Sequence, residues 1–142
     1  MGYKKQVRLL LILTFVLTVG IFAVFYFEKE SLSILSELFG KRIYYSDIAP
    51  AGESIFFLSA TLLLSLIPLY FLKEGIYKAW RKFAVIYLPI AILWIAASDP
   101  YGGGGYVGML DSREQVTFFV SGLFLIISLI LIIYKSIKLR KK

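Results

Sequence analysis

The sequence contains no cysteine, no histidine and no asparagine. The first two absences exclude disulfides, thiolate nucleophiles, imidazole bases and the usual zinc sites. The lack of asparagine excludes N-glycosylation, because the acceptor sequon begins with that residue. We therefore interpret the chain as a protein that is not an enzyme, and we expect it to bind no cofactor.

Charged residues are missing from the interior of the long apolar runs. Asp, Glu, Lys and Arg occur only at or beyond the edges of these runs, as at Arg8, Arg81 and Lys82. Ionisable groups inside a membrane mark proton relays, coupled transporters and ion sites. Intramembrane proteases need Asp pairs or a His-Glu-x-x-His motif, and neither is present. Coupled transport and membrane hydrolysis are therefore both disfavoured.

Apolar sequence, in contrast, is abundant. The 142 residues are 59% hydrophobic with a mean hydropathy of +0.80, which is too apolar for the single core of a soluble domain. Four apolar runs, at about 9–27, 55–72, 80–97 and 116–134, approach the length that a helix needs to cross ~30 Å of hydrocarbon. The sequence therefore predicts an all-α fold with one domain, 1–142. This domain is an integral membrane bundle of four antiparallel transmembrane helices.

Positive charge is concentrated on one predicted side of the membrane. The amino terminus, the region of the inner loop 73–79 and the carboxyl tail hold 12 of the 16 basic residues, whereas the outer loops 28–54 and 98–115 hold eight of the nine acids. The twelve are Lys4, Lys5, Arg8, Lys73, Lys78, Arg81, Lys82, Lys135, Lys138, Arg140, Lys141 and Lys142. The positive-inside rule then places both termini in the cytoplasm of a multi-pass plasma-membrane protein. We expect the basic side chains to contact anionic lipid headgroups at the inner face and not nucleic acid.

Within the first outer loop, apolar residues recur at helical spacing. Leu32, Leu35, Leu38 and Phe39 alternate with polar residues, and Gly40 is a natural helix stop. This pattern predicts a short amphipathic helix that lies along the outer membrane interface. A docking surface for a protein partner is the alternative interpretation, because exposed apolar patches also serve partners.

Two local patterns concern the third and fourth runs. Tyr77, Trp80 and Trp94 flank the third run, and we expect them to anchor it at the membrane interfaces. Ser112 and Gln115 have the spacing of a capping box, so Ser112 is predicted to start the fourth helix.

The second outer loop is the least generic stretch, with the sequence SDPYGGGGYVGMLDSREQ. Its glycines leave backbone N–H groups unobstructed, and two tyrosines bracket them. We interpret it as a candidate site for a protein partner or a lipid headgroup. Its residues are Tyr101, Gly103, Gly104, Gly105, Tyr106 and Gly108. A plain connector is the alternative, and a cation site at Asp99, Asp111 and Glu114 is a third, weaker interpretation, so no metal is predicted.

Hydroxyl side chains within the runs are the remaining candidates, because such groups line pores or bond across helices. They are Thr14, Thr18, Ser59, Ser65, Thr117 and Ser121. The leading hypothesis is a small non-catalytic accessory or assembly protein, either a subunit of a larger membrane complex or a self-associating bundle. The alternative is a pore or an uncoupled permeation pathway for a small solute or ion. A third hypothesis is an immunity-type protein that acts against a pore-forming toxin.

The charge asymmetry gives a topology prediction. In intact cells, a cysteine introduced by Ser36→Cys or Gly104→Cys should react with a membrane-impermeant thiol reagent, and one introduced by Lys78→Cys should not. The chain has no cysteine of its own, so labelling reports only the new residue. Labelling at position 78 without permeabilisation would reverse the predicted orientation.

Overall fold

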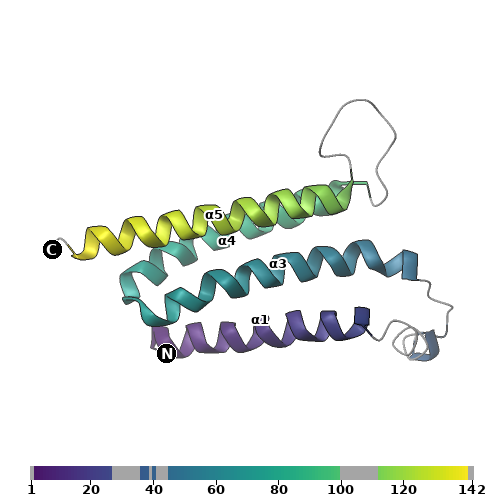
Figure 1. Cartoon of the computed structure of the whole chain (residues 1–142), viewed down its shortest axis with the longest axis horizontal. Coiled ribbons are helices and arrows are strands. Elements are labelled where there is room, and N and C mark those ends of the chain that lie inside the picture. The colour runs from purple at the N-terminus through teal and green to yellow at the C-terminus, as the bar shows by residue number, and fades with distance from the viewer. Residues whose placement is uncertain (1, 27–35, 39, 41–44, 100–111, 141–142) are drawn as a thin grey trace.

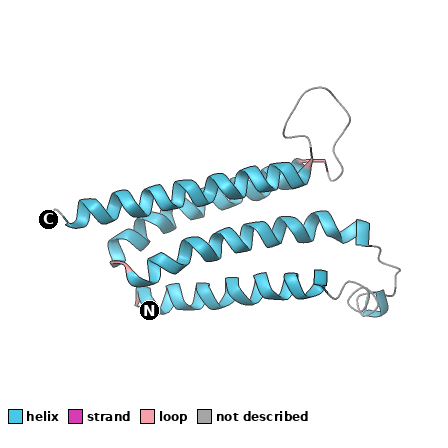
Figure 2. Ribbon diagram, in the orientation of Figure 1, coloured by secondary structure: helices cyan, strands magenta, loops and turns pink. Residues whose placement is uncertain are grey.

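Four long helices make up the structure, a computed structural model that describes residues 2–26, 36–38, 40, 45–99 and 112–140. The helices are α1 (Tyr3–Tyr26), α3 (Tyr45–Phe71), α4 (Glu74–Ala97) and α5 (Arg113–Arg140). Figure 1 shows both chain termini at the same end of the bundle, which we call the terminal end. The opposite end, where α5 begins, is called the Arg113 end. Figure 2 shows no strand among the described residues, so the all-α prediction is confirmed.

Each of the four helices is long and apolar enough to cross a membrane. The candidate spans are Tyr3–Phe25, Ala49–Phe71, Glu74–Ala97 and Arg113–Leu139. Every one exceeds the ~20 residues that a transmembrane helix needs. The prediction of four helices that are long and apolar enough to span a membrane is therefore confirmed, and it is consistent with a multi-pass membrane protein.

The predicted amphipathic helix lies mostly outside the described residues. Residues 36–38 are helical, and Gly40 has a backbone φ of 63°. A glycine with positive φ commonly follows the last turn of a helix. The membrane-surface helix itself stays a prediction.

The inner loop is much shorter than the predicted range 73–79, because α4 already begins at Glu74. Only Leu72 and Lys73 separate it from α3. A first-turn acid suits the positive end of a helix, and the Glu74 carboxylate also lies 2.9 Å from the Lys78 ammonium one turn later. Charged residues that looked like a loop therefore continue the helix beyond its apolar part.

The start of α5 agrees with the predicted capping box. The backbone N–H of Gln115 donates to the Ser112 hydroxyl over 3.3 Å, and the helix begins at the next residue, Arg113. This bond satisfies one of the N–H groups that have no partner in the first turn of a helix. Ser112 is therefore an N-cap, as its spacing indicates.

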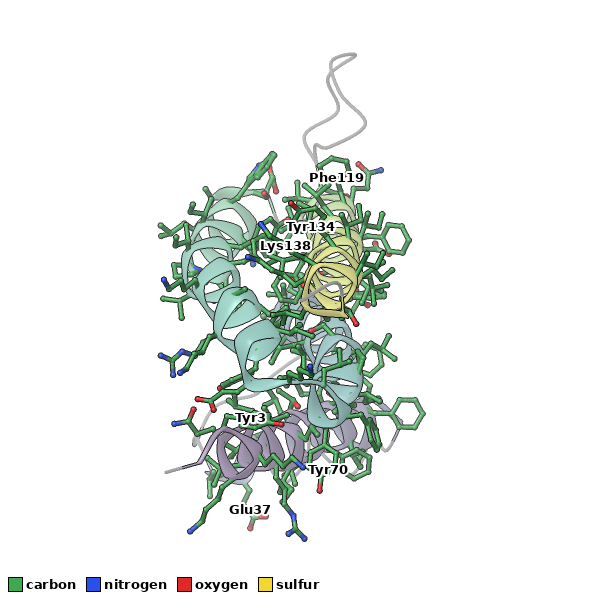
Figure 3. All side chains as sticks on the ribbon, turned by 90° about the vertical axis from the view of Figure 1, so that its left-hand side faces the viewer. Tyr3, Glu37, Tyr70, Phe119, Tyr134 and Lys138 are labelled. Carbon is green, nitrogen blue, oxygen red and sulfur yellow. The ribbon has the colours of Figure 1, made fainter. Side chains whose placement is uncertain are left out.

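The helices are not packed equally against each other. Helix α3 lies between α1 and α5, whereas α4 packs mainly against α5 and only weakly against α1 and α3. Figure 3 views the bundle from its terminal end and shows α1 and α5 on opposite sides. Consequently α1 depends mostly on α3 for support.

The larger of two buried clusters extends from the terminal end to the middle of the bundle, where aromatic rings surround Phe124. We call this group of rings the Phe124 cluster; it comprises Tyr77, Trp80, Phe83, Tyr87 and Phe124. The rings of Phe83 and Phe124 stack with centroids 5.6 Å apart, and those of Tyr87 and Phe124 are 5.4 Å apart. Phe124 itself is fully buried. Offset and edge-on ring pairs of this kind stabilise beyond the area that they bury.

This cluster corrects the predicted role of two aromatic residues. Tyr77 and Trp80 are only 2% and 3% exposed, so they are core residues and not interface anchors. The indole N–H of Trp80 donates to the buried Ser128 hydroxyl over 3.1 Å, which explains how its polar edge is accommodated inside the bundle. Trp94 is 47% exposed, so its ring is accessible to the surroundings of the helix.

The Phe124 cluster gives a stability prediction. Phe124→Ala should lower the free energy of unfolding by about 3 kcal/mol, because it removes the ring against which the aromatic side chains of α4 pack and leaves a cavity. Phe15→Ala is the matched control, because Phe15 lies in α1 with 56% of its surface exposed, and it should change the same quantity by less than ~1 kcal/mol. Denaturant-induced unfolding in detergent micelles measures both. Equal losses would contradict the assignment of Phe124 as the centre of the core.

Candidate functional site

The residues of the predicted outer-loop site lie outside the described part of the chain. They are Tyr101, Gly103, Gly104, Gly105, Tyr106 and Gly108. Asp111, one of the weak cation candidates, also lies outside it, whereas Asp99 and Glu114 are described and exposed. Within the described ranges, no group of three or more acidic side chains is placed to hold a metal ion. The partner-binding role of this loop therefore stays a prediction.

The hydroxyl side chains predicted as pore-lining candidates lie at two different helix contacts. The Thr18 hydroxyl donates to Ser59 across 3.0 Å and thereby joins α1 to α3. Thr117 of α5 lies 2.9 Å from the hydroxyl of Ser54 of α3. The fold therefore distributes these groups over the α1–α3 and α3–α5 contacts.

The other hydroxyl candidates bond within their own helix or are simply buried. Thr14 donates to the Leu10 carbonyl over 2.8 Å, and Ser65 donates to the Leu62 carbonyl over 2.8 Å. Ser121 is 2% exposed, and its hydroxyl has no hydrogen-bond partner among the described residues. These groups satisfy backbone carbonyls or fill the small spaces where helices approach closely.

Sequence reasoning missed two of the polar residues that join the helices. Ser54 bonds Thr117, and Ser128 accepts from Trp80. A signal for Ser128 was present, because Thr117, Ser121 and Ser128 recur at spacings of four and seven in an otherwise apolar helix. That spacing places small polar residues on one face, which indicates a helix–helix interface.

One concave surface lies on the outward side of α5, and we call it the α5 hollow. Its volume is about 810 Å³. It is lined by Phe57, Ser112, Glu114, Gln115, Phe118, Phe119, Gly122, Leu123 and Ile126. Phe118 and Phe119 are 68% and 46% exposed, and Figure 3 shows the Phe119 ring on α5. A Cβ added at Gly122 would meet nothing within 4 Å, so the backbone is openly accessible there.

A second concave surface lies between α1, α3 and α4 toward the Arg113 end, and we call it the α1–α4 groove. Its volume is about 500 Å³. It is lined by Thr14, Leu17, Ala51, Ser54, Ile55, Leu58, Ser59, Leu62, Leu88, Ile92, Ile95, Ala96 and Arg113. The groove exists because α4 has few contacts with α1 and α3. Its walls are mostly apolar, but Thr14 and Ser59, two of the predicted hydroxyl candidates, lie together in its lining with Ser54, and its one charged residue is Arg113.

Arg113 also joins the ends of α4 and α5. Its backbone N–H donates to the Asp99 carbonyl over 2.8 Å, beside an isolated bridge between Asp99 and Ser112. Its guanidinium donates through Nη2 to the Ser98 carbonyl over 3.2 Å. The Nε of the same group is buried and has no hydrogen-bond partner among the described residues. The guanidinium is therefore held at the groove, and not all of its five N–H donors are used by these bonds.

No family model, no curated protein and no solved structure matches the chain. The candidate sites are therefore two of the concave surfaces that the described helices create. The α5 hollow is open and rimmed by aromatic rings, whereas the α1–α4 groove is apolar with a cation at one end.

The hydrogen bond between Ser54 and Thr117 gives a testable prediction. In a double-mutant cycle with Ser54→Ala and Thr117→Val, the coupling free energy should be about 0.6 kcal/mol and below ~2 kcal/mol. Unfolding of the single and double variants in detergent measures this quantity. A coupling near zero would mean that the two hydroxyls do not bond across the α3–α5 contact.

Proposed function

We propose that the protein is a small non-catalytic accessory or assembly protein of the plasma membrane, which binds a transmembrane helix of a partner through the α5 hollow. The partner helix belongs either to a larger membrane complex or to a second copy of this chain. Both chain termini are proposed to lie in the cytoplasm, as the distribution of basic residues predicts. The observation that carries the proposal is the open backbone at Gly122 between exposed aromatic rings.

The chemistry of the α5 hollow suits helix association in a lipid environment. Lipid tails are as apolar as leucine, so helices associate there through close packing and hydrogen bonds. Gly122 permits a close approach of another backbone, and Phe118 and Phe119 supply large rigid surfaces beside it. Glu114 and Gln115 provide polar groups at the Arg113 end of the same surface. A partner helix would therefore find both a close contact and an orienting polar edge.

The interior polar groups support an accessory role in preference to a pore. Thr18 bonds Ser59, and Ser54 bonds Thr117, so four hydroxyls are engaged in joining helices. These bonds lie at two separate helix contacts, whereas a conducting pathway needs polar groups along one continuous route. A pore built from one copy of the chain is therefore the weaker proposal. No feature of the described residues favours the immunity-type hypothesis.

The proposal is tested by Gly122→Leu. A Cβ at this position meets nothing within 4 Å, and leucine favours a helix more than glycine by ~0.8 kcal/mol, so the fold should be kept. The leucine would, however, occupy the place of closest approach to a partner helix. We expect recovery of the stoichiometric complex in mild detergent to fall about tenfold, as overpacking at a tight contact usually causes. Size-exclusion chromatography with quantification of the co-purified chains measures this.

Gly20→Leu is the matched control. Gly20 lies in α1, and a Cβ added there also meets nothing within 4 Å. The substitution is therefore the same in chemistry and in its effect on helix propensity, but it leaves the α5 hollow unchanged. With Gly20→Leu, the recovery of the complex should equal that of the wild type. Equal recovery by Gly122→Leu and the wild type would refute the proposed role of the α5 hollow.

A further inference from the structure

We infer that the α1–α4 groove binds one acyl chain of an anionic phospholipid, whose phosphate lies against the Arg113 guanidinium. This inference goes beyond the proposed function and does not depend on it, because the groove and the α5 hollow share no lining residue. The lipid belongs to the membrane leaflet at the Arg113 end of the bundle. Its position follows from the length, the volume and the single charge of the groove.

The length of the groove matches one leaflet of a bilayer. Its lining on α3 extends from Ala51 to Leu62, which corresponds to ~16 Å along a helix that rises 1.5 Å per residue. A bilayer has a hydrocarbon core of ~30 Å, so one leaflet contributes about half of that depth. The groove therefore runs from the polar edge of the membrane to its middle, as one acyl chain does.

The volume and the lining of the groove suit an acyl chain. The groove offers about 500 Å³. Small-molecule sites commonly have volumes of this size and apolar walls with a few polar groups. A single flexible acyl chain matches a groove of this size and lining.

The charge of the groove favours an anionic headgroup. Arg113 is the first residue of α5, where the positive end of the helix makes a cation unfavourable. Its guanidinium bonds the Ser98 carbonyl, and its buried Nε has no hydrogen-bond partner within the described ranges. The ion pair between Lys78 and Glu74 lies at the other end of the bundle. A phosphate beside Arg113 would therefore supply both a counter-charge and hydrogen-bond acceptors.

The described carboxylates at this end of the bundle do not line the groove. Glu114 is exposed and lines the α5 hollow, and neither Glu53 nor Asp99 is among the residues that line the groove. The lining farthest from Arg113 includes Leu62 and Leu88, which suit the end of an acyl chain. The groove thus has one cationic end and one apolar end, in the order that a phospholipid presents its headgroup and its tail.

Native mass spectrometry of the full chain tests the inference. The protein is released from nanodiscs that contain phosphatidylglycerol and phosphatidylcholine with identical acyl chains. We expect the wild type to retain one phosphatidylglycerol about tenfold more often than one phosphatidylcholine, because charge-assisted bonds to phosphate are reinforced by the net negative charge of the headgroup. Arg113→Gln should bring this ratio close to one.

The apolar part of the site has its own matched pair of variants. Ala96 and Ala97 are both exposed at the end of α4, but only Ala96 lines the groove. Ala96→Phe should fill the groove and lower retention of both lipids about tenfold, whereas Ala97→Phe should behave like the wild type. This pair of variants tests lipid binding in the groove even if Arg113→Gln fails to fold.

Three results would overturn the inference. The first is an unchanged preference for phosphatidylglycerol in Arg113→Gln. The second is an equal loss of lipid in Ala96→Phe and Ala97→Phe. The third is a dimer of the chain that Ala96→Phe dissociates while lipid retention is unchanged, which would identify a second copy as the occupant.

Discussion

In a bilayer, the hydrophobic effect does not drive the association of helices, because the lipid tails are as apolar as the side chains. The structure meets this constraint with shape and with a few polar bonds. Phe124 lies among the rings of α4, and Trp80 donates to the buried Ser128. Tyr3 adds a bond from its hydroxyl to the Leu72 carbonyl over 2.9 Å, which attaches the start of α1 to the turn between α3 and α4. The buried cluster around Phe124 contains residues from all four helices.

Toward the Arg113 end the helices pack unequally. There α4 packs through Ala91 and Ile95 against α5, α1 is held to α3 by Thr18 and Ser59, and α3 is joined to α5 by Ser54 and Thr117. The α1–α4 groove lies where α4 has few contacts with α1 and α3. Its apolar walls would be costly in water but are compatible with lipid. The bundle thus carries two concave surfaces of different character, the apolar α1–α4 groove with its cation and the α5 hollow with its exposed rings.

The sequence was sufficient for the number and class of the helices, because the thickness of the hydrocarbon core dictates the length of each apolar run. The sequence predicted the ends of the helices less well. Helix α4 includes charged residues such as Lys78, which the hydropathy pattern assigns to a loop but which solvent or headgroups can accommodate on a helix. The predicted role of Trp80 was wrong, because an indole beside basic residues has the sequence pattern of a membrane-interface anchor. Its true partner, Ser128, is 48 residues away, and only the fold brings them together. The groove could not be foreseen either, since it arises from the unequal packing of helices.

The contact between Asp99 and Arg113 bears on how the fold responds to changes in chain length. The end of α4 and the start of α5 lie side by side, where the Arg113 N–H donates to the Asp99 carbonyl. The two helix ends are therefore joined by a hydrogen bond of their own. The entropy of closing a loop grows only slowly with its length, by about 0.6 kcal/mol for each doubling. A change in the number of residues between Asp99 and Arg113 should therefore cost this helix junction little free energy.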